Sequence, residues 1–369
     1  MKDSYVRLAL RLAGRGYGAT SPNPMVGAVL VKGGKVIGRG WHHRAGEPHA
    51  EIEALRDAQE RGHVVKGATL YVTLEPCCTR GRTPPCTDAI VAARIKHVVA
   101  GAVDPNPRHR GRGFRILRQA GLAVTRGLMA EECARLNEAF NHWIVQRTPL
   151  VTVKAGMTLD GKIATAAGES RWITGEKARA YGMKLRQGMD AILVGINTVL
   201  ADDPSLTVRI QKSKVQSHWL RRIVLDAEGR TPLGAKIVSD EWAGLTTIVV
   251  SKSAPERRIA ALAKRVNVLV APSSEGKINL PWLLKRLGSQ NVTSLLVEGG
   301  GEVNASFLLQ GLAQRVVFCY APMILGGRDS RRAVAGDGAR TLAESLSLTG
   351  LEWRQLGPDW LLSARVKPR

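Results

Sequence analysis

The chain lacks the features of a membrane-spanning or exported protein. Its first apolar stretch, YVRLALRLAG, is interrupted by arginines and predicts an amphipathic helix instead of a signal peptide. No stretch of the 369 residues approaches the length of a membrane span. Cysteine is scarce, and its odd number, five, argues against a disulfide framework. These absences favour a cytoplasmic protein with no membrane partner.

Acidic and aromatic side chains are also scarce. The chain has 31 acidic against 54 basic residues, a net charge of +23, and only 5% aromatic residues. Such an excess of positive charge is typical of nucleic-acid-binding proteins. However, residues 1–146 carry 22 basic and 12 acidic side chains and residues 147–369 carry 32 and 19, so both halves share the excess. Dispersed arginine fits pockets for phosphorylated small molecules better, and we expect no nucleic-acid partner.

The residues with clear chemistry lie between positions 47 and 86. His49 and Glu51 open a predicted helix, Cys77 follows a predicted strand at residues 68–75, and Cys86 opens a second helix. One imidazole and two thiolates suit a catalytic zinc ion that keeps a fourth position open for water. Glu51 is then placed to move protons without holding the metal. This is the pattern of the zinc deaminases, in which an amino-bearing ring carbon is attacked by activated water.

The spacing of the two cysteines distinguishes between families of zinc deaminases. Eight residues separate Cys77 from Cys86, whereas nucleic-acid and cytidine deaminases usually have two. The longer segment CCTRGRTPPC resembles the deaminase half of the bifunctional riboflavin-biosynthesis deaminase/reductases. Cys78 is the nearby candidate for a fourth ligand of a structural zinc. Because adjacent cysteines rarely bind one metal together, we expect Cys78 to point away.

The flanking segments predict an α/β domain over residues 1–147. A helix at residues 3–16 precedes the loop SPNP, a strand at 26–31 and a hairpin, and a helix at 129–146 ends before Thr148-Pro149. Asn23, between two prolines, is either a turn residue or a ligand, and its surroundings match the substrate-binding loop of that family. His42 and His43 have no assigned role.

Residues 148–369 predict a second α/β domain. We expect a strand at 151–155, a helix at 176–186 and an apolar strand at 190–200 that leads into a loop. The phrases KAGMTLDGKIA, ESRWITG, LVGINTVLADDPSLTVR and LLVEGGGEVNASFLLQGLAQRVVFCYAPMILGG resemble the reductase half of the same family. The resemblance implies a cytidine-deaminase-like zinc domain followed by a dihydrofolate-reductase-like domain that uses NADPH.

A run of three glycines at 299–301 lies between an apolar strand and a helix. Glycines at a helix N-terminus let backbone N–H groups approach a phosphate, although the Rossmann pattern is absent and glycine runs are often only turns. Carried over residue by residue, the resemblance implies cofactor contacts from Gly156, Trp172, Thr198, Asp202, Gly299, Gly300, Gly301, Glu302, Val303 and Asn304. It implies substrate contacts from Ser170, Arg186, Leu206, Arg209 and Glu298, besides Asn23.

The sequence therefore predicts two successive reactions on one chain. The first is zinc-dependent hydrolytic deamination of a phosphorylated diaminopyrimidinone, with Glu51 as the proton carrier. The second is NADPH-dependent reduction of its ribosyl group, for which Lys154, Asp160 and Lys162 are possible proton donors. Two alternatives are a tRNA-type deaminase with an accessory basic domain and a zinc-stabilised regulatory protein without turnover. Apolar patches in the second domain also predict a homo-oligomer.

Overall fold

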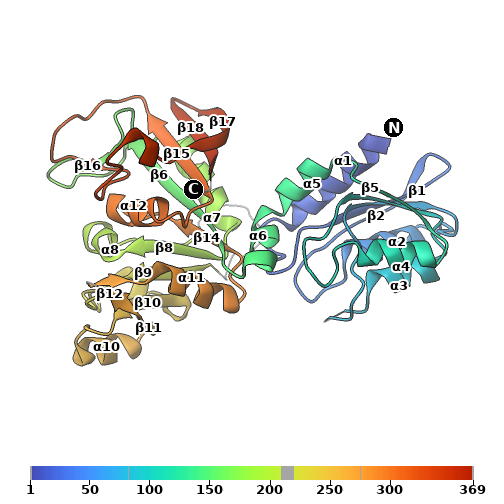
Figure 1. Ribbon diagram of the computed structural model, residues 1–369, viewed down its shortest axis with the longest axis horizontal. Coiled ribbons are helices and arrows are strands. Elements are labelled where there is room, and N and C mark those ends of the chain that lie inside the picture. The colour runs from blue at the N-terminus through green and yellow to red at the C-terminus, as the bar shows by residue number, and fades with distance from the viewer. Residues whose placement is uncertain (1, 82, 209–219, 275, 368–369) are drawn as a thin grey trace. The chain divides into compact units, whose positions relative to one another are not determined.

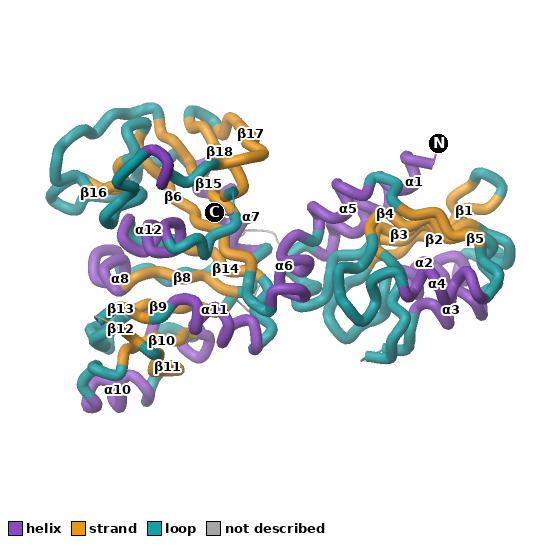
Figure 2. Tube along the Cα trace, in the orientation of Figure 1, coloured by secondary structure: helices purple, strands orange, loops and turns teal. Residues whose placement is uncertain are grey.

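The computed structural model describes residues 2–81, 83–208, 220–274 and 276–367 (Figures 1 and 2). The chain divides into two compact units, Met1–Arg147 and Thr148–Arg369. In the described residues, no helix combines the length and the apolar character needed to cross a membrane. Both units are α/β, so the predicted fold class is confirmed.

The first unit is built on a five-stranded sheet of order β2-β1-β3-β4-β5. β1 is antiparallel to β2 and β3, whereas β3, β4 and β5 are parallel. The strands are β1 (Gly27–Lys32), β2 (Lys35–Trp41), β3 (Thr69–Leu74), β4 (His97–Ala102) and β5 (Ala123–Arg126). The helices are α1 (Lys2–Ala13), α2 (Ala50–Glu60), α3 (Cys86–Ala92), α4 (Arg112–Gln119), α5 (Ala130–Leu136) and α6 (Glu138–Gln146), with a 3₁₀ turn at Gly14–Gly16.

Helices cover both faces of this sheet. Because successive side chains of a strand point to opposite faces, Ala28 and Leu30 of β1 pack with α2, α3 and α4, whereas Val29 and Val31 pack with α1 and α5 (Figure 1). The apolar strands are therefore buried on both sides. Polar side chains that could form a site are therefore expected mainly in the loops at the ends of the strands.

The second unit is built on a nine-stranded sheet of order β11-β10-β9-β8-β14-β6-β15-β18-β17. Its strands are parallel except for the terminal hairpin of β17 and β18. The strands are β6 (Leu150–Thr158), β8 (Ala191–Gly195), β9 (Arg221–Leu225), β10 (Thr246–Ser251), β11 (Asn267–Ala271), β14 (Ser294–Val297), β15 (Arg315–Ala321), β17 (Leu348–Leu356) and β18 (Asp359–Val366).

The helices of this unit also form two layers. α11 and α12 pack on one face of the sheet through Leu283 and Phe307, and α8, α9 and α10 pack on the other. The helices are α7 (Glu176–Gln187), α8 (Ile196–Asp202), α9 (Lys236–Ser239), α10 (Glu256–Ala263), α11 (Leu280–Ser289) and α12 (Gly301–Leu309). Two small pairs, β7 (Lys162–Ala164) with β16 (Arg331–Arg332) and β12 (Ser273–Ser274) with β13 (Lys277–Ile278), and 3₁₀ turns at Ala243–Leu245 and Leu342–Glu344 complete the unit.

Two local sequence expectations are wrong. The strand expected at 190–200 ends at Gly195, and the following residues form α8, because Ile196 and Val199 are buried at helical spacing. The single helix expected at 129–146 is interrupted at Asn137. There the side-chain amide accepts from the N–H of Met25 and donates to its carbonyl. At the break, Asn137 thus contacts a residue 112 positions away in sequence.

Candidate functional site

His49, Cys77 and Cys86 meet at one edge of the first sheet. His49 is the N-cap of α2, Cys86 is the first residue of α3, and Cys77 lies beyond the end of β3. Their potential ligand atoms all lie within 4.8 Å of one another. The Nδ1 atom of His49 is 3.5 Å from the Cys77 sulfur and 3.3 Å from the Cys86 sulfur. The sequence-predicted ligand set is thus brought together with a nitrogen and two sulfur donors, which fits zinc.

The two thiols and the carboxyl group of Glu51 are electrostatically coupled. Hydrogen bonds from Cys86 and His49 lower the pKa of Cys77 to about 4, whereas the pKa of Cys86 is raised by its bond to Cys77 and by burial. A metal ion would favour loss of the remaining thiol proton. Glu51 is 3% exposed, and burial raises its pKa to about 7. A carboxyl group with that pKa can both accept and release a proton near neutral pH.

Cys78 takes no part in the three-residue cluster. Its sulfur lies 3.4 Å from Nδ1 of His109, which is also 3.4 Å from the Cys78 backbone nitrogen. The group His49, Cys77 and Cys86 is complete without it in the described residues. Three protein donors leave a coordination position for water or substrate, as in catalytic zinc sites.

The side chain of Asn23 contacts His42, a residue to which the sequence assigns no role. His42 is buried, and its Nδ1 lies 3.1 Å from the carbonyl of Pro48. That partner requires a donor, so Nε2 is free to accept from the side-chain amide of Asn23 at 3.1 Å. The rings of His42 and His49 also pack edge to face, with centroids 5.1 Å apart. His42 therefore orients both a predicted ligand of the substrate and a predicted ligand of the metal.

Glu75 is a second residue that the sequence did not single out. Its buried carboxylate accepts backbone N–H bonds from Asp104 at 3.2 Å and from Gly111 and Gly113 at 2.9 Å each. These bonds fasten the loop after β4 beside Cys77. A run of apolar residues that ends in Glu75 gives no sign of such distant backbone partners.

A pocket of about 500 Å³ lies in the second unit, at the carboxyl ends of β6, β14, β8 and β9. This is where open parallel sheets bind their ligands. Among the residues predicted from the sequence, its lining includes Gly156, Ser170, Thr198, Asp202, Glu298, Gly299, Gly300, Gly301, Glu302 and Val303. Asn197, Arg331 and Arg332 also line it, although the sequence analysis predicts no role for these three residues.

The other predicted residues lie outside the lining. Trp172 is 70% exposed, with the guanidinium of Arg179 4.6 Å from its ring centroid. Leu206 is buried, and Asn304 is buried with its amide donating to the carbonyl of Ala333. Arg209 falls outside the described residues.

A charged cluster lies at the pocket, where two of its three members, Lys154 and Glu298, belong to the lining. Arg186 donates to both carboxylate oxygens of Glu298, at 3.1 and 2.7 Å, and the amino group of Lys154 lies 4.0 Å from the same carboxylate. Burial alone would raise the pKa of Glu298, but Lys154 and Arg186 lower it to about 2. Glu298 is therefore ionised at neutral pH. Lys154, which lines the pocket, carries a positive charge that partly balances the charge of Glu298.

The glycines at the start of α12 differ in the space around them. A Cβ atom on Gly301 would collide with the carbonyl oxygen of Arg332, so close packing requires that glycine. At Gly300 a Cβ would meet nothing closer than the Thr198 hydroxyl at 4.0 Å, so the backbone there borders open space. Opposite, Asp202 accepts from the Ser170 hydroxyl at 3.0 Å. The arrangement offers N–H groups and hydroxyls to a phosphate-containing ligand.

Known protein families match both units. Residues 149–362 match the RibD C-terminal domain, and residues 1–102 match the cytidine and deoxycytidylate deaminase zinc-binding region. The riboflavin biosynthesis protein RibD of Aquifex aeolicus is 44% identical over 97% of both chains. That of Escherichia coli is 41% identical over 97% of this chain and 98% of its own.

Solved structures agree with these matches. RibD of Acinetobacter baumannii is 36% identical and superposes with a TM-score of 0.88 over 99% of both chains. A diaminohydroxyphosphoribosylaminopyrimidine deaminase/5-amino-6-(5-phosphoribosylamino)uracil reductase of Thermotoga maritima is 34% identical, with a TM-score of 0.84 over 99% of both chains. The chain therefore belongs to the RibD family, the bifunctional deaminase/reductases of riboflavin biosynthesis.

Proposed function

We propose that residues 1–147 deaminate 2,5-diamino-6-(5-phosphoribosylamino)pyrimidin-4(3H)-one and that residues 148–369 reduce the product with NADPH. The product of both steps is 5-amino-6-(5-phosphoribitylamino)uracil. The observation that carries the first step is the buried Glu51 beside His49, Cys77 and Cys86. The pocket bounded by glycines and by the Lys154–Glu298–Arg186 cluster supports the second.

In the deaminase half, His49, Cys77 and Cys86 would hold the zinc ion, which supplies Lewis-acid activation of water when bound. Glu51 takes the proton of the attacking water and delivers it to the departing ammonia. Its pKa of about 7 suits both directions of transfer. Asn23, held by His42, donates or accepts hydrogen bonds at the pyrimidine edge. The same residues support a small-molecule substrate more directly than RNA.

In the reductase half, NADPH supplies the hydride when bound. The ring-opened ribosylamine is an imine, whose carbon takes the hydride and whose nitrogen needs a proton. Asp160 is a poor proton source, because hydrogen bonds from Thr158 and from the N–H groups of Leu325 and Gly326 lower its pKa to about 2. Lys162 is absent from the pocket lining, whereas Lys154 lines it beside Glu298. We assign the proton donor to Lys154.

The far end of the pocket supports a cofactor with an additional phosphate. Arg230 follows β9 and donates to the side chain of Asn197, a lining residue, at 3.2 Å. The buried Asp226 carboxylate accepts from the N–H groups of Arg230 and Thr231, and Arg258 donates to the carbonyls on either side of Arg230. β9 lies three strand spacings from β6, roughly 14 Å, the scale of an extended dinucleotide. A guanidinium there suits the phosphorylated ribose of NADPH.

The edge strand β17 supports the proposed homo-oligomer. It is the last strand of the nine-stranded sheet, and its residues from Thr349 to Gln355 are exposed. Leu351 and Trp353 are 52% and 55% exposed. An edge strand that exposes two large apolar side chains favours pairing with another chain, and we propose a second copy as that chain.

Replacing Glu51 with glutamine should abolish ammonia release while zinc binding remains, because the amide keeps the shape but cannot carry the proton. We expect a loss of at least about 100-fold in deaminase kcat, measured with metal content by atomic absorption. The matched variant Cys86→Ser should lose zinc as well as activity. Full turnover by the zinc-loaded Glu51→Gln protein would remove Glu51 from the mechanism.

Replacing Lys154 with methionine should lower the rate of NADPH oxidation by on the order of 100-fold. Ammonia release should stay unchanged, because the proposed deamination uses only residues 1–147. NADPH binding should also stay unchanged, because Lys154 is not among the residues proposed to bind the cofactor. Lys162→Met is the control, since Lys162 is absent from the lining. An equal loss of the NADPH oxidation rate in both variants would contradict the assignment of Lys154 as the proton donor.

Replacing Arg230 with alanine should weaken NADP⁺ binding by roughly 10- to 100-fold, as for lost charge-assisted hydrogen bonds. NAD⁺ binding, measured in the same calorimetric titration, should change little. Arg257→Ala, on the exposed part of the neighbouring helix α10, is the control. A parallel loss for both dinucleotides would place the extra phosphate elsewhere.

Replacing Leu351 and Trp353 together with glutamate should reduce the molar mass measured by light scattering to that of one chain. Charges on an edge strand oppose strand pairing. Leu342→Glu, at a residue 93% exposed outside the sheet, should leave the mass unchanged. An unaltered oligomer in the double variant would exclude β17 as the contact.

A further inference from the structure

Arg222 is a charged residue in the apolar interior of the second unit. It lies on β9 with 1% of its side chain exposed, and its register partners on the neighbouring strands are Ile192 and Thr246. Its side of the sheet packs against α8, α9 and α10. Because well-packed apolar residues stabilise such a place as well as a buried ion pair does, the need for a filled core does not account for an arginine here.

The guanidinium group of Arg222 makes four hydrogen bonds. Two go to the carboxylate of Asp240, at 2.6 and 2.7 Å, one to the carbonyl of Ile237 at 3.1 Å, and one to the carbonyl of Ser205 at 2.9 Å. Asp240 and Ile237 belong to α9 and its C-cap. Arg222 thus joins β9, α9 and the loop that contains Ser205.

That loop has an unfavourable backbone conformation. Asp203 and Leu206, on either side of Ser205, have φ values of 42° and 50°, in the left-handed region that side chains disfavour. Such conformations persist where surrounding contacts impose them. Arg222 binds the carbonyl between the two strained residues, and the N–H of Lys236 in α9 donates to the side chain of Asp203 at 2.8 Å.

The same loop is also linked, through Arg186, to Glu298 in the lining of the reductase pocket. Arg186, which binds Glu298, donates to the carbonyl of Thr207 at 3.1 Å. Ser205 and Thr207 are therefore held by two arginines, one in the interior and one at the pocket. Leu206, predicted as a substrate contact, lies between these two attachment points.

We propose that Arg222 is a positioning residue for the substrate of the reductase: with Asp240 it sets the conformation of the loop at 203–207 and so the affinity for the phosphorylated pyrimidine. The inference deepens the proposed function and rests on it. It predicts an effect on the Michaelis constant of the pyrimidine alone. None of the four hydrogen bonds of Arg222 goes to the glycine run that would hold the cofactor pyrophosphate.

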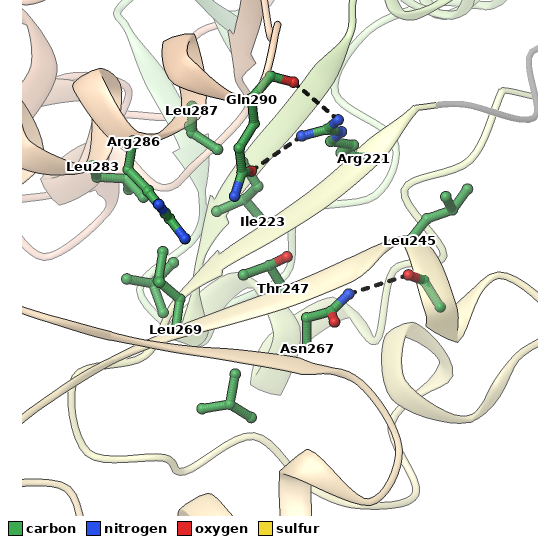
Figure 3. A pocket seen from close by; sticks show the side chains of 13 residues that line it. Arg221, Ile223, Leu245, Thr247, Asn267, Leu269, Leu283, Arg286, Leu287 and Gln290 are labelled. Atoms are coloured by element: carbon green, nitrogen blue, oxygen red, sulfur yellow. Dashed lines mark hydrogen bonds between the residues drawn. The ribbon is translucent and has the colours of Figure 1, made fainter.

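The neighbouring residue provides a matched control. Arg221 points to the opposite face of the same strand, where it donates to the side chain of Gln290 and to its carbonyl, each at 3.2 Å (Figure 3). It lines a separate hollow with Leu283 and Leu287 of α11 (Figure 3). Arg221 therefore resembles Arg222 in type, strand and carbonyl bonding, but it has no bond to the loop at 203–207.

The test compares Arg222→Lys, the double variant Arg222→Met/Asp240→Leu and the control Arg221→Lys. Lysine retains the charge beside Asp240, but its three donors lie on one nitrogen and cannot reproduce the four bonds that the planar guanidinium group makes from two nitrogens. The double variant removes both charges and should unfold at the same or a higher temperature than the wild type. For each protein we would measure ammonia release, the NADPH dissociation constant by fluorescence, and kcat and KM of NADPH oxidation with the deaminated pyrimidine.

The proposal predicts a rise in the KM of the pyrimidine on the order of 10-fold in both Arg222 variants. Ammonia release, NADPH affinity and the control variant should remain near wild type. An unchanged KM in a folded Arg222 variant, an equal loss of NADPH affinity, or the same KM rise in Arg221→Lys would overturn it. If the double variant does not fold, Arg222→Lys decides. Wild-type protein that oxidises no NADPH would instead refute the proposed function, and this inference with it.

Discussion

Both functional sites depend on one constraint, the common direction of parallel strands. Parallel strands bring all their carboxyl ends to one edge of a sheet, and the helices that follow begin there with free N–H groups. In the first unit this edge gathers Cys77 after β3 and the starts of α2 and α3. In the second unit it gathers the ends of β6, β14, β8 and β9 around one pocket. The apolar strands thus form the core, and the polar side chains and free N–H groups of the candidate sites lie at their carboxyl ends.

A second common feature of both units is buried charge that is paired with other groups of the protein. A carboxylate removed from water needs a partner. Glu75 uses three backbone N–H groups, Glu298 uses Arg186 and Lys154, and Asp240 uses Arg222. In the first two cases the partners also lie at a candidate site, beside Cys77 and at the pocket of the second unit. Arg186, engaged with Glu298 and with the carbonyl of Thr207, orders the pocket wall in addition to any contact with a substrate phosphate.

The sequence predicts well what depends on short-range patterns. The spacing of His49, Cys77 and Cys86 indicates a metal cluster, since each residue stands next to a recognisable helix start or strand end. The glycine run likewise predicts the helix start of α12. The family phrases extend this to the order of two domains. Most of the residues predicted for the second site, including Ser170 and Thr198, line the pocket.

What the sequence does not reveal depends on long-range contacts. The role of His42 becomes visible only from its contacts with Pro48 and Asn23. The role of Asn137 likewise becomes visible only from its contact with Met25. α8 forms where the apolar run at 190–200 predicts a strand, and its residues Ile196 and Val199 pack on the sheet from a helix. Arg331 and Arg332 reach the pocket through a strand that pairs with β7, far away in sequence.

The most direct test of the account is a two-stage assay on 2,5-diamino-6-(5-phosphoribosylamino)pyrimidin-4(3H)-one with zinc-loaded protein. Ammonia release is measured first without a cofactor, and NADPH oxidation is measured after NADPH is added. The account predicts both signals, with NADPH oxidation dependent on prior ammonia release. Ammonia without NADPH oxidation would contradict the assignment of the glycine-lined pocket. The absence of both signals would contradict the substrate itself and favour RNA as the alternative.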